Sequence, residues 1–191
     1  MLGDLTLVRP TRDHLAGFVA ALEAGWSPNT LDPDYGRRIL GLLGDDADAY
    51  LDGLTDRDPQ GAMIDLPDGS RVPRLPQTTR WMWDGEFCGS IGFRWVSGTE
   101  ELPPHVLGHI GYAVVPWKQG RGIATAAVGL ILADAAAEGL RWVEISTDPD
   151  NVASQRVIER NGGVLVERFA YPAAYGRADG LRYRVAIAAG V

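Results

Sequence analysis

The chain has 191 residues, 46% hydrophobic and 23% charged, which is ordinary composition for one compact globular domain. Its 25 acidic and 18 basic residues give a net charge of −7, which disfavours nucleic-acid binding because that function usually requires a basic excess. The single cysteine, Cys88, excludes an intramolecular disulfide and a cysteine-based zinc site. No secretory signal or membrane-length apolar run is visible, so we expect a cytoplasmic protein with no membrane partner.

The negative charge is concentrated in one segment. Residues 45–68 contain eight aspartates and one arginine, a balance of −7 that equals the net charge of the whole chain. Residues 101–191 contain nine acidic and nine basic residues and are therefore neutral. The acidic segment either attracts a cationic substrate or forms a solvated surface.

Hydrophobic periodicity and turn residues predict alternating strands and helices along the chain. The first part contains a strand over 5–10, a helix over 11–24, a second helix from residue 32 and a loop over 59–76. The second part contains a hairpin over 79–96, strands over 107–115, 142–147, 164–171 and 181–188, and helices over 122–138 and 151–160. The connection from 107–115 through a helix to 142–147 is typical of a right-handed parallel crossover. We therefore predict one α/β domain with a mixed, mostly antiparallel central sheet flanked by helices.

The block from Val114 to Thr125 carries the clearest chemical signal. A strand stops at Pro116, and a short loop with Gly120 and Gly122 opens directly onto a helix. The first turn of a helix has unpaired N–H groups and a partial positive charge, and glycine lets a ligand approach the backbone closely. With Lys118 and Arg121 nearby, the pattern predicts a phosphate or pyrophosphate site, although a flexible turn would have the same residues.

Known phosphate-binding loops fit this block to different degrees. The Gly-Lys-Ser/Thr ending of a P-loop is absent, and Thr125 stands where the dinucleotide fingerprint needs its third glycine. Gln119-Gly-Arg-Gly-Ile-Ala124 instead resembles the pyrophosphate loop of the GNAT superfamily, the acetyl-CoA-dependent N-acetyltransferases. The strand Gly108–Pro116 and the helix start Asn151-Val-Ala-Ser154 also resemble that family, so the likeness covers residues 77–171. The Asn-x-x-Ser form is similar to the subgroup that includes ribosomal-protein alanine acetyltransferases.

The resemblance implies a single GNAT-like domain over 1–191. Its three parts are acceptor-side helices and an acidic loop over 1–76, an acetyl-CoA-binding core over 77–171 and a C-terminal strand over 172–191. The implied activity is transfer of an acetyl group from acetyl-CoA to a primary amine, by direct attack in a ternary complex. The amine belongs either to a small molecule or to a peptide. Two alternatives are a non-catalytic acyl-CoA-binding module and a dinucleotide-binding oxidoreductase.

The resemblance also assigns the residues that bind acetyl-CoA. Backbone groups of Val114 and Val115 would bind the pantetheine arm. The amides of the loop would surround the diphosphate, and they belong to Gln119, Gly120, Arg121, Gly122, Ile123, Ala124 and Thr125. Asn151 would orient the thioester or cap its helix, and Arg160 lies either near the adenosine end or at a solvated helix end.

Acetyl transfer to an amine needs an acid for the leaving thiolate and a base for the amine. Many GNAT members use a tyrosine acid where this chain has Ile158, so the resemblance transfers that role to Ser154. Candidates for the base are His109 in the strand beside the thioester and Glu144 in the neighbouring strand.

Several further expectations concern the surroundings of the site. Glu167 and Tyr171 are further candidates to act as a base through a water, and Tyr35 and Tyr50 either line the acceptor pocket or belong to the core. The three histidines have no metal-ligand spacing, so no metal is expected. Strand ends near 171–188 favour a homodimer.

Overall fold

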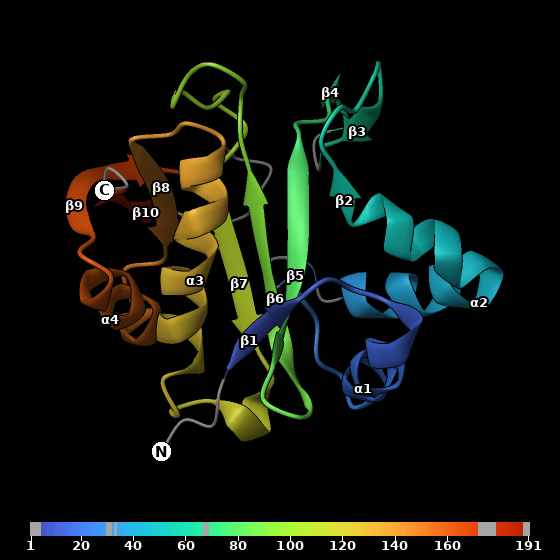
Figure 1. The fold of residues 1–191 in the computed structure, drawn as a ribbon. Helices are drawn as coiled ribbons and strands as arrows, with labels where there is room; N and C mark the ends of the chain where they lie inside the picture. The colour runs from blue at the N-terminus through green and yellow to red at the C-terminus, as the bar shows by residue number, and fades with distance from the viewer. Residues whose placement is uncertain (1–4, 30–31, 33, 67–68, 172–178, 189–191) are drawn as a thin grey trace.

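The computed structural model describes residues 5–29, 32, 34–66, 69–171 and 179–188, and these form antiparallel sheets with helices on both sides (Figure 1). The helices are α1 (Arg12–Glu23), α2 (Tyr35–Gly53), α3 (Ile123–Ala137) and α4 (Val152–Arg160), with a short 3-10 turn, η1 (Pro116–Lys118). The strands are β1 (Thr6–Val8), β2 (Thr55–Asp56), β3 (Met63–Asp65), β4 (Arg71–Pro73), β5 (Gln77–Trp83), β6 (Phe87–Arg94), β7 (Ile110–Val114), β8 (Trp142–Thr147), β9 (Val164–Ala170) and β10 (Asp179–Ala186). The predicted α/β class is confirmed.

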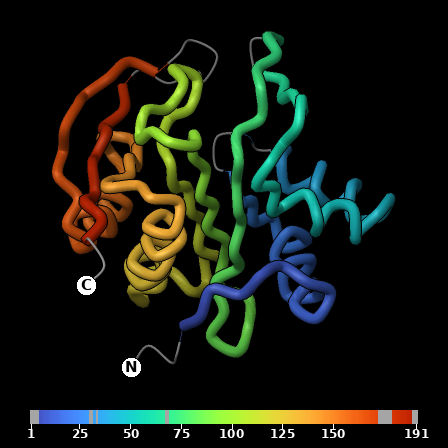
Figure 2. The backbone as a smooth tube through the Cα atoms, turned by 45° about the horizontal axis from the view of Figure 1, so that its top comes forward, coloured from blue at the N-terminus to red at the C-terminus, as the bar shows by residue number. Residues whose placement is uncertain are grey.

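The strands form two main sheets that meet at one point. The larger sheet has the order β1-β5-β6-β7, with β2 beside β5, and the second has the order β8-β10-β9. In both views the second sheet lies on the side of the molecule away from α1 and α2 (Figures 1 and 2). The crossover through α3 therefore joins the two sheets rather than two strands of one sheet.

The predicted crossover does not place β7 and β8 in one mixed sheet, because no ladder joins these strands in the described chain. They touch at one end, where the His109 N–H donates to the Glu144 carbonyl over 2.7 Å and the Ser146 hydroxyl donates to the Leu107 carbonyl. The Glu144 N–H bonds to a side chain, His109 Nδ1, instead of to a backbone carbonyl. No ladder continues from this contact, and a gap opens between the two strands.

Two apolar cores hold the helices against the larger sheet. On one face α1 and α2 pack against the sheet, and the rings of Phe18 and Trp81 stack with centroids 4.6 Å apart. On the other face α3 presents the fully buried Ala127 and Val128 to the strands. Burying one large apolar side chain stabilises the fold by roughly 1.5–3 kcal/mol, so both helix layers are firmly attached to the sheet.

The acidic region and the predicted loop after it are more regular than expected. Helix α2 continues through the first aspartates, with a kink at Asp46 where φ is −157° and ψ is 95°. The loop predicted over 59–76 contains the hairpin of β3 and β4, so that prediction is wrong. The Leu66 N–H donates to the Ser70 carbonyl, and Gly69 has a φ of +81°. Gly69 therefore belongs to the turn of a hairpin.

Candidate active site

The glycine loop between β7 and α3 has the backbone geometry of an anion site. Gly120 and Gly122 have φ values of +73° and +79°, a region that other residues rarely adopt. Gly122 is the N-cap of α3 and has no side chain to cap it, and the first intrahelical bond is from the Ala126 N–H to the Gly122 carbonyl. The N–H groups of the first turn are therefore available to an anionic ligand.

Side chains of the loop fold back onto its own backbone. The Gln119 amide donates to the Val114 carbonyl over 3.1 Å, and the Arg121 guanidinium donates to the Trp117 carbonyl over 3.2 Å. These two bonds order the loop. A pantetheine arm that binds Val114 would lie beside the Gln119 amide.

Val115 does not fit the pantetheine role that the resemblance implies for it. Its side chain is fully buried, its N–H donates to the Cys88 carbonyl, and its own carbonyl accepts the Lys118 N–H. Both backbone groups of Val115 are therefore bonded to backbone, whereas among the described residues the Val114 carbonyl is bonded only by the exposed Gln119 side chain, so Val114 is the better candidate.

Lys118 does not add charge to the phosphate loop, contrary to the prediction. Its side chain is 6% exposed, and its ammonium lies 2.6 Å from Asp84 Oδ1 and 3.2 Å from Glu86 Oε2. The hydrogen bond from Lys118 keeps the pKa of Asp84 below its ordinary value. Lys118 therefore attaches the loop to the β5–β6 turn. Of the two cations predicted near the phosphate site, Arg121 is the one whose charge remains at the loop.

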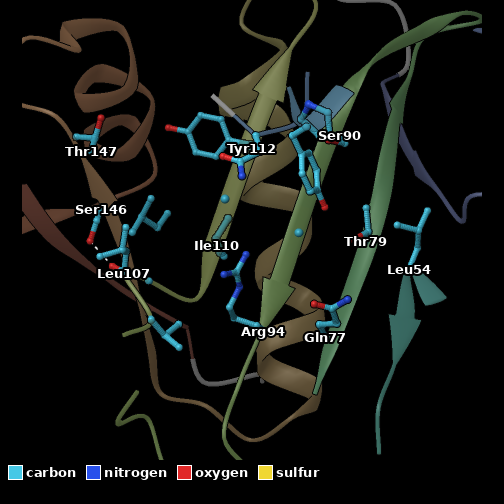
Figure 3. Close-up of a pocket in the computed structure, with 18 of the residues that line it drawn as sticks. Leu54, Gln77, Thr79, Ser90, Arg94, Leu107, Ile110, Tyr112, Ser146 and Thr147 are labelled. Carbon is cyan, nitrogen blue, oxygen red and sulfur yellow. Dashed lines mark hydrogen bonds between the residues drawn. The ribbon is translucent and has the colours of Figure 1, made fainter. Parts of the chain in front are cut away.

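A cavity of about 650 Å³ lies on the α1–α2 face of the sheet and reaches the gap between β7 and β8 (Figure 3). Its wall includes the predicted acceptor residues Tyr35 and Tyr50, and its far end includes Asn151, the N-cap of α4. One cavity therefore joins the acceptor side of the sheet to the helix that the resemblance associates with the thioester.

Tyr112 and Ser154 meet at this gap. Tyr112 projects from β7 toward α4 (Figure 3), and its hydroxyl lies 2.8 Å from Ser154 Oγ. Burial raises the pKa of Tyr112 to about 12, so its phenol stays protonated at neutral pH. Asn151 Oδ1 accepts the Ser154 N–H over 3.0 Å and so fixes the turn that carries this serine.

The sequence reasoning missed Tyr112. It lies inside the quoted strand motif, but that motif drew attention to the backbone of its last residues. Tyr112 and Ser154 are 42 positions apart, and no sequence pattern shows that β7 and α4 bring their hydroxyl groups together.

His109 does not fit the role of general base. It is fully buried, is not among the cavity-lining residues, and its Nδ1 accepts the Glu144 N–H over 2.9 Å. That bond assigns the ring proton to Nε2, which has no hydrogen-bond partner among the described residues. Burial lowers the pKa of His109 to about 4, so the ring is a neutral structural acceptor at neutral pH.

Glu144 does not reach the cavity either. Its carboxylate is paired with Arg184 at 3.0 Å and with Arg182 at 3.5 Å, in a separate hollow of the surface. Glu167 faces the same hollow and is paired with Arg182 at 2.5 Å. Both carboxylates are neutralised by arginines away from the reacting groups.

Among the described residues, the carboxylate that lines the cavity is Asp148. Tyr171 also lines it, and its hydroxyl donates to Asp148 Oδ1 over 3.0 Å. In the sequence, Asp148 begins an Asp-Pro-Asp-Asn stretch at the end of a strand, and it was not among the candidates for the base. Asp148 lies at the end of β8, where the gap opens. It is therefore the acidic side chain that best fits the role of the base that the reaction needs.

The remaining predicted residues lie at the outer end of α4. Arg160 is exposed in its last turn, and the neighbouring Asn161 amide donates to the Thr125 carbonyl in the first turn of α3 over 3.1 Å. The end of α4 is thus attached to the glycine loop. Within the described residues no cluster of His, Cys, Asp and Glu is arranged to hold a metal ion, and no helix is long and apolar enough to span a membrane.

Comparison with solved structures shows similar folds at low sequence identity. The RimL ribosomal L7/L12 α-N-protein acetyltransferase with coenzyme A has a TM-score of 0.62 and 17% identity, with 100% of this chain and 98% of that chain covered. RimJ of Mycobacterium smegmatis has a TM-score of 0.63 and 20% identity, with 97% and 83% covered. The microcin C7 self-immunity acetyltransferase MccE, bound to acetyl-CoA and AMP, has a TM-score of 0.61 and 14% identity, with 97% and 94% covered. No curated protein matches by sequence.

The family assignment comes from the sequence. The family description "Acetyltransferase (GNAT) domain" matches residues 4–164, which is most of the chain and includes both the glycine loop and the Tyr112–Ser154 pair. The protein therefore belongs to the GNAT family and is an acetyl-CoA-dependent acetyltransferase.

Proposed function

We propose that the protein transfers the acetyl group of acetyl-CoA directly to a primary amine while both substrates are bound. The observation that carries this proposal is the continuous cavity that joins the acceptor face of the sheet to Tyr112, whose hydroxyl lies 2.8 Å from Ser154 Oγ. Direct transfer requires the amine and the thioester to meet in one space. A covalent intermediate would instead need a nucleophile there, and the single cysteine, Cys88, is fully buried.

Acetyl-CoA would bind along the gap and the glycine loop. The pantetheine arm would lie beside the Val114 backbone, and the diphosphate would accept bonds from the amides of residues 119–125. Arg121 would add positive charge there, and Arg160 would lie near the adenosine end. Support for this arrangement comes from the uncapped start of α3 and from the two left-handed glycines of the loop.

The reaction needs two proton movements. The amine nitrogen attacks the thioester carbon, a tetrahedral oxyanion forms, and the carbon–sulfur bond then breaks. Ser154 would give its hydroxyl proton to the departing thiolate and regain one from the Tyr112 phenol, which lies 2.8 Å away. Tyr112 would then recover a proton from solvent, to which Asp148 releases the proton taken from the amine. Asp148, the carboxylate in the cavity, would take the proton that the amine loses.

A thermal-shift assay followed by an amine screen tests this function. We expect acetyl-CoA to raise the melting temperature and NAD to leave it unchanged. Amines should then release free CoA thiol in proportion to acetylated product. Stabilisation without thiol release from any amine would indicate an acyl-CoA-binding module, and stabilisation by NAD alone would indicate a dinucleotide enzyme.

Two further proposals concern cellular location and oligomeric state. We propose that the protein is cytoplasmic and forms a homodimer. Strand β9 is the outer strand of its sheet, and its exposed Val164, Leu165 and Val166 support pairing with a second copy.

A further inference from the structure

Helix α4 extends from the proposed acid to the start of α3. Ser154 lies in the first turn of α4, and Asn161 is the residue that ends this helix. Asn161 follows Ser154 by seven positions, which corresponds to about 10 Å along a helix. The end of α4 lies beside the first turns of α3 (Figure 1), where the diphosphate of acetyl-CoA is proposed to bind. One short helix therefore reaches both ends of the proposed cofactor site.

The side-chain amide of Asn161 joins the two helices. Its nitrogen donates to the Thr125 carbonyl over 3.1 Å and to the Val157 carbonyl, in its own helix, over 2.9 Å. Because both neighbours are acceptors, these contacts assign the amide nitrogen to this side. Among the described residues, the bond to Thr125 is the one hydrogen bond between α3 and α4. The polar contact between the two helices therefore comes from a single side chain.

Thr125 connects this contact to the proposed anion site. It is the third residue of α3, and it precedes Ala126, whose N–H makes the first intrahelical bond. The Thr125 N–H is therefore one of the first-turn groups proposed to bind the diphosphate, while its carbonyl accepts the Asn161 amide. Both groups belong to one helical turn, so a shift at this carbonyl also shifts the amides of the anion site.

Gly129, one turn further along α3, makes room for the Asn161 amide. An added Cβ at Gly129 would lie 3.2 Å from Asn161 Oδ1, which is closer than ordinary van der Waals contact. Gly129 is exposed and is not among the glycines with positive φ, so the backbone conformation does not require glycine here. Glycine destabilises a helix interior relative to alanine, and the space that Asn161 occupies gives it a structural reason. Both helices therefore contribute to this contact.

The backbone around Asn161 is held firmly in place. Its N–H donates to the Ile158 carbonyl over 3.0 Å, and the Ile158 side chain is fully buried in the core. The next residue, Gly162, has a φ of +80° and ends the helix with a sharp turn. The Asn161 side chain therefore reaches α3 from a fixed point.

We propose that Asn161 is a positioning residue that sets the separation between the diphosphate site at the start of α3 and Ser154 at the start of α4. The thioester of bound acetyl-CoA is thereby placed against its acid. This inference rests on the proposed acetyl transfer and adds a residue that acts on it through the two helices. A misplacement of about 1 Å can slow a reaction about a hundredfold, so a small change in this separation has a measurable effect.

Two thioesters of different length test the proposal. Acetyl-CoA reaches both sites, whereas S-acetylpantetheine ends before the diphosphate and can settle against Ser154 freely. With the best amine of the screen, Asn161→Ala should lower kcat for acetyl-CoA about tenfold and leave kcat/KM for S-acetylpantetheine within about twofold. Asn161→Asp keeps the shape but loses the amide donors, and with acetyl-CoA it should be no faster than Asn161→Ala. Equal losses with both thioesters, or an unchanged kcat for acetyl-CoA, would overturn the proposal.

A variant of Gly129 separates positioning from stability. Gly129→Ala places a methyl group against Asn161 Oδ1 and should lower kcat for acetyl-CoA about threefold. Its melting temperature should not fall, because alanine favours a helix over glycine. In the Asn161→Ala background the same change should have no further effect on kcat, since the amide that it displaces is already absent. Losses that multiply in the double variant would contradict the proposal.

The matched control for this variant is Gly41→Ala. Gly41 lies in α2, where an added Cβ meets nothing within 4 Å. The substitution should leave kcat for acetyl-CoA unchanged. A loss equal to that of Gly129→Ala would show that the effect does not arise at Asn161.

A binding measurement judges the inference apart from turnover. If the wild type binds acetyl-CoA but no amine releases thiol, the proposed function fails, and isothermal titration with CoA and with ADP then tests the positioning role. CoA reaches both sites and ADP reaches the diphosphate site alone. Asn161→Ala should therefore raise the Kd for CoA about fivefold and leave that for ADP within about twofold. The same titration decides the question if S-acetylpantetheine reacts too slowly to measure. Equal changes for the two ligands, or no change for either, would overturn the positioning role.

Discussion

The hydroxyl groups of Tyr112 on β7 and Ser154 on α4 lie 2.8 Å apart at the gap between β7 and β8. Each hydroxyl comes from a different side of the gap, so the pair exists only because β7 and β8 fail to form a ladder beyond His109. The gap proposed to admit pantetheine and the pair proposed to protonate its sulfur therefore have one structural origin.

Removing the Tyr112 hydroxyl should slow the chemical step and leave cofactor binding intact. We expect Tyr112→Phe to lower kcat by about tenfold and Ser154→Ala by about a hundredfold, within the usual range for a general acid. Because the two groups act in series, the double variant should be no slower than about the Ser154→Ala variant. Steady-state thiol release checks the rates, and thermal shift with acetyl-CoA checks that the cofactor still binds.

Independent effects of the two substitutions on kcat would contradict this relay. Independent losses that multiply in the double variant would show that Tyr112 acts separately from Ser154. Unchanged turnover in Ser154→Ala would remove the serine as the acid.

Filling the cavity floor at Gly92 should block the acceptor and spare the cofactor. A Cβ at Gly92 would meet its nearest atoms at 3.9 Å, and Gly92 is not among the glycines with positive φ, so the backbone tolerates a side chain. Gly92→Leu should raise KM for the amine by about tenfold or more, because the new side chain takes the space of the acceptor.

The control is Gly41→Leu, at an α2 position where an added Cβ meets nothing within 4 Å. It should leave both kcat and KM unchanged. Loss of acetyl-CoA stabilisation in Gly92→Leu would show that this part of the cavity belongs to the cofactor.

Local patterns were enough to predict most of the fold. Hydrophobic periodicity and turn residues predicted the hairpin of β5 and β6, and the two glycines at 120 and 122 predicted the start of α3. These features depend on neighbours in the chain. The hairpin of β3 and β4 was missed because its strands are three residues each and its many turn residues dominate the composition.

The site was predicted less completely because its partners are distant in sequence. The sequence predicts that Lys118 binds phosphate, but in the fold Asp84, 34 positions away, neutralises its charge. His109 reads as a base until its Nδ1 is seen to accept the Glu144 N–H. A sequence shows which side chains can carry a charge or a proton, and only the fold shows which partner each one has.

Replacing Lys118 should lower stability, whereas replacing Arg121 should lower the affinity for the cofactor. Lys118→Met leaves the Asp84 carboxylate without its buried partner and should lower the free energy of unfolding by about 2 kcal/mol. Arg121→Gln should leave stability unchanged and raise the Kd for acetyl-CoA about fivefold, because a charge beside the diphosphate is lost. Urea unfolding and isothermal titration measure the two effects, and a larger change in affinity for Lys118→Met than for Arg121→Gln would contradict the assignment.

Protonation of His109 should destabilise the protein below neutral pH. The folded-state pKa of about 4 lies below the value of about 6.5 for an unfolded chain, so between these values the unfolded chain binds more protons. The stabilisation is complete above about pH 6.5 and is lost as the pH falls toward 4. For one buried imidazole it amounts to on the order of 2–3 kcal/mol. Replacing His109 by Asn keeps a hydrogen-bond acceptor near Nδ1 and removes the titration, so the pH dependence of unfolding in urea should flatten over this window. His14→Asn, at a histidine on α1, is the matched control and should keep the wild-type slope.

Turnover in His109→Asn should stay within about threefold of wild type at pH 7.5, whereas loss of a general base would lower turnover about a hundredfold or more. A loss of that size in a variant that still binds acetyl-CoA would restore His109 as the base.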